Sequence, residues 1–283
     1  MPDQPIHVAA FYRFAPIADP QALAQALRAQ GAADGLVGSI ILAREGLNGT
    51  IAGTGEAVDA LLARLRAEPG CAELTARRHR TERLPFARWK IKVKPEIVTM
   101  GVAGIDPTRE VGTHVPPAQW NALISDQDTI LIDTRNDYEV AIGTFEGAID
   151  PQTARFGDFP AWFDAQAEQW RAEGRTPRIA MFCTGGIRCE KSTAFVRARG
   201  FDDVYHLQGG ILAYLAEIEE DRSLWRGECF VFDERVSLTH GEREGASVIC
   251  TDCGQPRASS TARCPQCAES GEAIAIREGG ALP

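Results

Sequence analysis

The chain has 283 residues, of which 44% are hydrophobic and 24% charged, so it is long enough for two domains and has the composition of an ordinary globular protein. Its longest apolar run is too short to span a bilayer, and its first residues lack the basic and then apolar segment of a secretory signal. We therefore expect a cytoplasmic protein with no membrane partner. The net charge of −9 argues against attraction of nucleic acid by the molecule as a whole, and we expect no DNA partner.

Residues 1–98 are predicted to form an α+β domain. Asp19 has the position of a helix N-cap, Pro20 follows at the first helical position, and Gly31 is expected to end that helix. The order of the predicted elements is β-α-β-β-α-β, which is that of a ferredoxin-like fold. The strands are expected over residues 7–14, 37–42, 50–52 and 88–98, with a turn at 44–49, and the second helix over residues 58–65.

The last of these strands carries the most informative charge pattern in the chain. Apolar residues at 89, 91 and 93 alternate with four cations, so the cations share one face of the strand, and four more arginines lie just upstream. Scattered lysines usually form a solvated surface, but like charges at every second position repel one another and gain from a polyanion laid across them. We expect nucleic-acid contact by Arg77, Arg78, Arg80, Arg83, Arg88, Lys90, Lys92 and Lys94.

Residues 99–116 combine proline and glycine with little periodicity, which is typical of a linker. Residues 117–226 then alternate short apolar strands with helices, which indicates a second domain with a parallel α/β sheet. The ligand site of such a sheet lies at the carboxyl ends of its strands.

One strand of that sheet, residues 179–182, ends at Cys183, where a tight loop leads into a helix. Two glycines let backbone amides gather around one point, and the helix N-terminus and Arg188 favour an anion there. Such surroundings lower the pKa of a thiol, so Cys183 is the expected nucleophile. A buried structural cysteine is the simpler interpretation, but it needs neither the glycines nor the arginine. The active loop consists of Thr184, Gly185, Gly186, Ile187 and Arg188.

Three further residues are assigned to the neighbourhood of this loop. Cys189 has the position to resolve an oxidised Cys183 by forming a disulfide, and a buried helix cysteine is the alternative. Asp133 and Arg135, at the end of another strand, are expected to orient the loop rather than to react.

Residues 227–283 form a short segment with two CxxC pairs. Cys250 and Cys253 are separated by ten residues from Cys264 and Cys267, which is the pattern of a four-cysteine zinc ribbon with a short spacer. A segment so poor in apolar residues gains its folding energy from a metal, so we expect structural zinc, with a flexible reduced tail as the alternative. Cysteines in such pairs also indicate a reducing compartment.

The segments ILIDTRNDYEVAIGTFEGAI, AMFCTGGIRCEKS and GFDDVYHLQGGILAYL resemble, in order and spacing, the rhodanese domain. In that family the cysteine that opens the active loop carries a persulfide, and a six-residue loop, here residues 183–188, suits sulfur chemistry. CTGGIRCEKS, the ferredoxin-like domain before it and GECFVFDERV after it resemble, more narrowly, the bacterial rhodanese-domain tRNA uridine hydroxylases. This resemblance implies oxygen-dependent 5-hydroxylation of the wobble uridine, with the anticodon region of tRNA as partner, molecular oxygen as co-substrate and Cys183 as the active-site cysteine.

The residues alone leave the mechanism open. A thiolate can attack C6 of uracil and make C5 electron-rich, or it can hold a persulfide or a sulfenate. The chain has no dinucleotide fingerprint, and its five histidines show no tight spacing with carboxylates typical of a non-haem iron site, so no redox cofactor is predicted. A sulfurtransferase that passes persulfide sulfur to a thiol acceptor and a non-catalytic RNA-binding adaptor are the alternatives.

Overall fold

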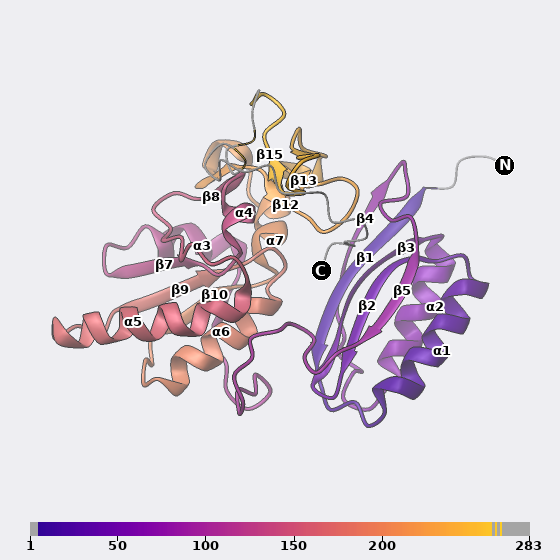
Figure 1. Cartoon of the computed structure of the whole chain (residues 1–283), viewed down its shortest axis with the longest axis horizontal. Helices are drawn as coiled ribbons and strands as arrows, with labels where there is room; N and C mark the ends of the chain where they lie inside the picture. Colours follow the sequence, from indigo (N-terminus) through magenta and orange to yellow (C-terminus); the bar gives the residue numbers. More distant parts are fainter. Residues whose placement is uncertain (1–4, 262–263, 265–266, 268–283) are drawn as a thin grey trace. The chain divides into compact units, whose positions relative to one another are not determined.

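The computed structural model describes residues 5–261, 264 and 267. The chain divides into two compact units, Met1–Thr99 and Met100–Pro283, and each unit has its own main β-sheet (Figure 1). The end of the predicted C-terminal segment, beyond residue 267, lies outside the described residues. Among the residues that are described, no helix is long and apolar enough to cross a membrane.

The first unit is a five-stranded sheet with two helices packed on one face (Figure 1). Its elements are β1 (Ile6–Phe14), α1 (Pro20–Ala33), β2 (Val37–Ala43), β3 (Gly46–Gly53), α2 (Gly55–Arg66), β4 (Ala76–Thr81) and β5 (Trp89–Val93). The strand order is β4-β1-β3-β2-β5, antiparallel except for the parallel pair β2 and β5. The ferredoxin-like order β-α-β-β-α-β is therefore present, and it is completed by β4.

The start of α1 agrees with the prediction, but its end does not. The Asp19 carboxylate accepts hydrogen bonds from the amides of Gln21 and Ala22, at 3.0 and 2.9 Å. Gly31 lies inside the helix instead of ending it. The indole of Trp89 packs against Gly31 so closely that a Cβ there would lie 2.2 Å from the ring. The glycine is thus a packing requirement of the helix–strand contact.

Two strand predictions in the first unit also need correction. The hairpin turn between β2 and β3 takes only residues 44 and 45, so β3 begins at Gly46 rather than near residue 50. The strand expected over residues 88–98 is the shorter β5, an extra edge strand parallel to β2, and the ferredoxin-like fold takes its last strand from β4. β4 was not predicted because its sequence, ARRHRT, lacks apolar alternation.

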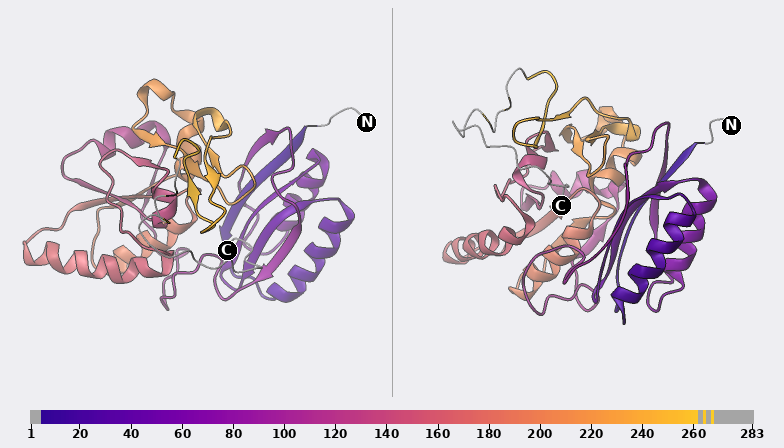
Figure 2. Two further views of the ribbon diagram at one scale, coloured as in Figure 1. Left: turned by 45° about the horizontal axis from the view of Figure 1, so that its top comes forward. Right: turned by 45° about the vertical axis from the view of Figure 1, so that its right-hand side comes forward.

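The second unit begins with a four-stranded parallel sheet in the order β6-β10-β9-β7. Helices cover both of its faces, with α3 and α7 on one side and α5 and α6 on the other (Figure 2). The elements are β6 (Thr113–Val115), α3 (Pro117–Ile124), β7 (Thr129–Asp133), α4 (Asp137–Val140), β8 (Gly143–Phe145), α5 (Phe159–Ala172), β9 (Arg178–Phe182), α6 (Ile187–Ala198), β10 (Val204–Leu207) and α7 (Gly210–Glu217).

Two features of this unit differ from the sequence-based expectation. The last residues of the expected linker form β6, the edge strand that pairs with β10. The alternation of strands and helices expected over residues 117–226 is interrupted after residue 143, because β8 lies outside the parallel sheet and pairs antiparallel with β11 (Trp225–Gly227), and Ile149 forms an isolated bridge to Ile132 of β7.

The remainder of the second unit contains two short strand pairs. β12 (Cys229–Phe230) pairs with β13 (Ser237–Leu238), and β14 (Val248–Ile249) pairs with β15 (Pro256–Arg257). The second pair lies next to the CxxC cysteines, because the amide of Cys250 donates to the carbonyl of Gln255 at 2.8 Å.

Candidate active site

The active loop connects the buried strand β9 to helix α6, at the carboxyl end of a parallel strand where such sheets bind ligands. Gly186 is the N-cap of α6 and has a φ of +98°, which a side chain would disfavour. Its amide donates a hydrogen bond to the sulfur of Cys183, with N···Sγ 3.2 Å. The helix N-terminus therefore faces the sulfur, as the sequence predicted.

The first residues of α7 hold the backbone of the loop in place. The amide of Ile211 donates to the carbonyl of Cys183 at 2.9 Å, and that of Leu212 donates to the carbonyl of Thr184 at 3.1 Å. Gly210 makes this approach possible, because a Cβ there would lie 2.5 Å from both carbonyl oxygens, and its φ is +67°. Gly210 is thus the point where α7 meets the loop.

The surroundings of Cys183 stabilise its thiolate. Burial by itself raises the pKa of this thiol, but the hydrogen bond from the Cys189 side chain, the charge of Arg188 and the amides of Cys189 and Gly186 outweigh burial and lower the pKa to about 6. Burial and the neighbouring Cys183 raise the pKa of Cys189 well above its usual value, so Cys189 stays a thiol and serves as donor. Cys183 is only 1% exposed, so a substrate reaches its sulfur only if the loop or a neighbouring segment moves.

Arg188 is fixed by a buried carboxylate that the sequence reasoning missed. Its guanidinium binds Glu139 in a bidentate manner, with Nη1···Oε2 2.5 Å and Nη2···Oε1 2.8 Å. Glu139 is fully buried, and the hydroxyl of Thr184 also donates to its Oε1, at 3.2 Å. The available signal was a helix-capping box: Asn136 precedes the short helix α4, and Glu139 lies three residues later.

Asp133 and Arg135 form a second buried ion pair beside the first. The Arg135 guanidinium donates to both carboxylate oxygens of Asp133, at 2.9 and 2.6 Å, and the residues are 0% exposed. Arg135 also donates to the carbonyl oxygens of Glu139, at 3.2 Å, and Gly143, at 2.6 Å. Arg135 therefore bonds to the backbone of the residue whose side chain holds Arg188.

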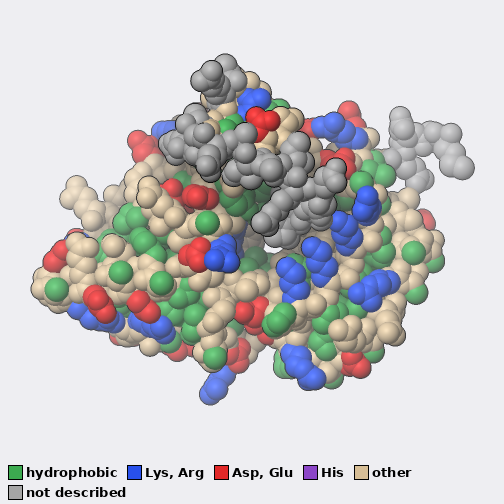
Figure 3. Space-filling view, in the orientation of Figure 1, with side chains coloured by type: hydrophobic (Ala, Val, Ile, Leu, Met, Phe, Trp, Pro, Cys, Tyr) green, Lys and Arg blue, Asp and Glu red, His purple; other side chains and the backbone are tan. Residues whose placement is uncertain are grey.

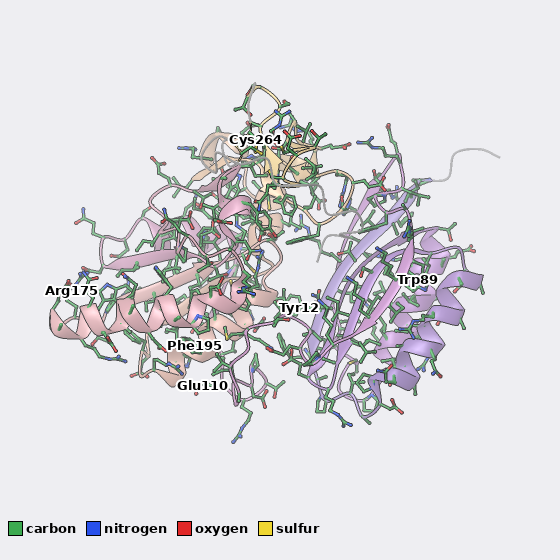
Figure 4. All side chains as sticks on the ribbon, in the orientation of Figure 1. Tyr12, Trp89, Glu110, Arg175, Phe195 and Cys264 are labelled. Carbon is green, nitrogen blue, oxygen red and sulfur yellow. The ribbon has the colours of Figure 1, made fainter. Side chains whose placement is uncertain are left out.

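The predicted basic residues of the first unit do not all lie on one face of its sheet. Ile91 is buried under the helices, and Trp89 and Val93 pack beside it, so Lys90 and Lys92 point to the opposite face. Lys94 follows β5 directly. Figure 3 shows a row of Lys and Arg side chains on this unit, and in Figure 4 Tyr12 lies on the side of the sheet away from the helices.

The arginines of β4 are divided between the two faces. Ala76 packs on the core, so Arg77 points to the face of the lysines. Arg78 lies on the helix side, where it forms an ion pair with Asp59 of α2, and alternation places Arg80 on that side as well. Neither Arg83 nor Arg88 is part of a strand.

The four cysteines of the C-terminal region lie together. Their sulfur atoms are all within 4.8 Å of one another, with Cys250 to Cys267 at 3.8 Å and Cys253 to Cys264 at 3.6 Å. Four thiols at such separations form a group that can bind a metal ion. The backbone turn between Cys250 and Cys253 closes with an amide-to-carbonyl bond from Gly254 to Cys250, at 2.9 Å.

Two family models match the chain, one for each sheet. The UPF0176 acylphosphatase like domain matches residues 6–97, and the rhodanese-like domain matches residues 116–217. The matches confirm the predicted fold class: an α+β domain, a parallel-sheet rhodanese domain and, after them, a cysteine-rich region.

Relatives named tRNA uridine(34) hydroxylase are similar to the chain over most of its length. The protein from Gluconobacter oxydans is 56% identical over 253 residues, which are 89% of this chain and 81% of the relative. Those from Caulobacter vibrioides and Brucella ovis are 56% and 52% identical, over 88% and 90% of this chain and 80% and 83% of the relatives. The chain belongs to the tRNA uridine(34) hydroxylase family.

Membership of this family confirms the resemblance inferred from CTGGIRCEKS and its flanking segments. In this chain, the loop residues assigned from sequence are one structural unit with Cys183, since Thr184 and Arg188 share the carboxylate of Glu139 and Gly186 bonds to the sulfur. The thiol of Cys189 lies beside the hydroxyl of Thr134, with Sγ···Oγ1 3.6 Å, and is fully buried.

Proposed function

We propose that this chain hydroxylates uridine 34 of tRNA at C5, with Cys183 as its reacting residue. The observation that carries the proposal is a thiolate with a pKa of about 6 on the rhodanese loop of a member of the tRNA uridine(34) hydroxylase family. A tRNA substrate and cysteines without disulfide bonds are both consistent with a location in the cytoplasm.

The thiolate acts as a nucleophile toward the uracil ring. Its attack on C6 forms a C–S bond and moves an electron pair toward C5, which then reacts with an oxidant. Loss of the C5 proton and departure of the thiolate restore the ring. One atom of molecular oxygen enters the product and the other leaves as water, so the reaction consumes two electrons from an external reductant.

The first test is nucleoside analysis of tRNA. Cells that contain only the Cys183→Ser protein are expected to lose 5-hydroxyuridine and the nucleosides derived from it. Cys71→Ser is the matched control, because Cys71 is a buried thiol of the other unit with a pKa raised chiefly by burial. Unchanged modification in the Cys183→Ser strain would contradict the proposal.

The second test separates the nucleophile from a sulfur carrier. A tRNA with 5-fluorouridine at position 34 is expected to form a denaturation-stable adduct with the unmodified protein under anaerobic conditions, and none with Cys183→Ser. A persulfide that is passed to a thiol acceptor would instead give cyanide-dependent thiocyanate formation and no adduct. That result would favour the sulfurtransferase.

The lysine face of β5, which comprises Lys90, Lys92 and Lys94, is proposed to bind the anticodon region of tRNA. Burial and the charges of Lys94 and Lys90 lower the pKa of Lys92, so a neighbouring polyanion relieves a repulsion that exists in the free protein. Arg77, which points to the same face of the sheet, is proposed to contribute to this contact.

The four C-terminal cysteines are proposed to hold a structural zinc ion. Four sulfur donors fill a tetrahedral shell, so the ion has no open position for substrate. Removal of the metal with a chelator is expected to raise the protease sensitivity of the region after residue 247, and zinc to reverse the effect.

A further inference from the structure

A second group of metal-ligating side chains lies on the face of the rhodanese sheet that α6 covers. It consists of His114 on β6, Glu190 on α6 and His206 on β10, and it is called the His–Glu–His cluster below. One ligand atom from each residue lies within 4.8 Å of the others. The cluster was not predicted, because its three residues are far apart along the chain.

The topology of the sheet brings the cluster together. β6 and β10 are neighbouring parallel strands, and His114 and His206 are direct register partners. Their rings meet edge to face with centroids 4.1 Å apart. Helix α6 crosses above them, and the Oε1 atom of Glu190 lies 3.0 Å from Nε2 of His114 and 4.0 Å from Nε2 of His206.

The hydrogen bonds around His206 leave a lone pair directed into the cluster. The Thr193 hydroxyl is 2.7 Å from the carbonyl of Cys189, to which it donates, and 3.3 Å from Nδ1 of His206. Since its one proton is used by the carbonyl, it accepts from the Nδ1–H of His206. Nε2 then carries no proton and can act as a ligand.

No hydrogen bond within the described part of the chain accounts for the burial of that Nε2 atom. It is buried, His206 is 1% exposed, and no hydrogen-bond partner lies within reach among the described residues. A simple hydrogen bond between His114 and Glu190 accounts for those two residues, but it does not account for a third, buried ligand atom pointed at the same carboxylate.

We propose that the His–Glu–His cluster binds a divalent first-row transition metal ion. Two imidazoles and one carboxylate are a donor set for such ions, and when they occupy one side of the ion they leave the other positions open. The side chain of His114 is 41% exposed, which gives the ion a path to the site. The site is distinct from the C-terminal cysteines, whose donors are all sulfur.

Among these ions we assign Fe(II), because non-haem oxygenases hold Fe(II) with this donor set. This choice rests on the proposed hydroxylation, whereas the binding of a divalent ion does not. Glu190 follows Cys189 directly, so the cluster and the thiolate share the first turns of α6.

Titration of the metal-free, full-length protein with Co(II) under anaerobic conditions tests the site. Two ions per chain are expected: one with the intense charge-transfer absorption of Co–thiolate bonds, at the cysteines, and one with weak visible bands typical of nitrogen and oxygen donors. Glu190→Gln and His114→Ala should each lower the affinity for the second ion by more than about 100-fold, since even the loss of an outer-shell partner lowers metal affinity by about 10–100-fold. Fe(II) should bind at the second site of the metal-free unmodified protein and compete there with Co(II) only when it is in excess, because Fe(II) binds such donors more weakly than Co(II).

Two controls keep the result specific. His240→Ala removes a histidine whose Nε2 also lacks a partner among the described residues but lies outside the cluster, and it should leave both ions in place. Cys183→Ser should also leave both ions in place. Loss of hydroxylation in that variant is then distinguished from loss of the metal. A titration that shows only the Co–thiolate ion, or a nitrogen- and oxygen-bound ion that persists in both cluster variants, would overturn the site.

Discussion

The two sheets of this protein use positive charge in opposite ways. In the rhodanese unit, Arg135 and Arg188 are buried and each binds a carboxylate through two hydrogen bonds. In the first unit, Lys90 and Lys92 lie on β5 and Lys94 follows it directly, and among the described residues no carboxylate lies within ion-pair distance of the three lysines. Buried arginines with internal partners fix the geometry of a site, whereas adjacent lysines without such partners are available to an external anion.

The largest expected effect is the loss of the internal partner of Arg188. Glu139→Ala leaves a buried guanidinium without its carboxylate and should lower the free energy of unfolding by about 3–5 kcal/mol, measured by urea denaturation. Glu146→Ala is the control, because Glu146 pairs with Arg226 at the surface and its loss should cost no more than about 0.5 kcal/mol. If the two substitutions lowered the free energy of unfolding equally, burial would not explain the contribution of the Glu139–Arg188 pair to stability.

The sequence predicted the rhodanese loop better than the network behind it. Cys183, the glycines and Arg188 are contiguous and have a recognisable spacing, so local chemistry identified them. Glu139 comes from a separate short helix, and only the folded chain shows that its side chain reaches Arg188. The same limit hid the His–Glu–His cluster, which depends on the register of two parallel strands.

In the first unit, the sequence predicted one of the two basic strands and missed the other. Alternation predicted the apolar and basic sides of β5, because its core side is apolar. β4 carries arginine on both faces, and it is recognised as a strand only by its pairing with β1. Gly31 was misassigned because the sequence does not show that an indole packs against it.

The hydrogen bond from Cys189 is the next largest contribution to be tested. Hydrogen bonds to charged groups are worth about 1.5–3 kcal/mol, so Cys189→Ala should raise the pKa of Cys183 from about 6 to between about 7 and 8. Since the thiolate is the reactive form, alkylation of Cys183 should rise with pH to half its maximum near pH 6 in the unmodified protein, and at higher pH in the variant. Cys189→Ser retains a donor and should shift the profile less; identical profiles for all three proteins would contradict the assignment.

A smaller effect is expected where α7 meets the loop. Gly210→Ala places a Cβ 2.5 Å from the carbonyl oxygens of Cys183 and Thr184 at a φ of +67°, and should cost about 1–3 kcal/mol of stability. Gly185→Ala, in the active loop that Gly210 contacts, is the control, since a Cβ there meets nothing within 4 Å. Urea denaturation of both variants measures the difference, and a destabilisation of similar size at Gly185 would refute the close-contact explanation.

The lysine face provides the last and smallest test of the contrast. Neutralising Lys90, Lys92 and Lys94 to Gln removes three charges, and at about 0.7 counterions per phosphate contact in single strands the slope of log K against log salt should flatten by about two. Fluorescence anisotropy with labelled tRNA over a range of salt concentrations measures that slope.

The charge-matched control neutralises Arg64, Arg66 and Arg78 to Gln. Arg64 and Arg78 form ion pairs with Glu68 and Asp59, and Arg66 donates to the carbonyl of Leu74, so these cations already have internal partners. If net charge alone attracted tRNA, the slope of log K against log salt would flatten equally in both triple variants. If the lysine face makes the contact, the slope flattens only in the lysine variant, because its charges, unlike those of the three arginines, have no internal partner among the described residues and can replace the counterions of a phosphate.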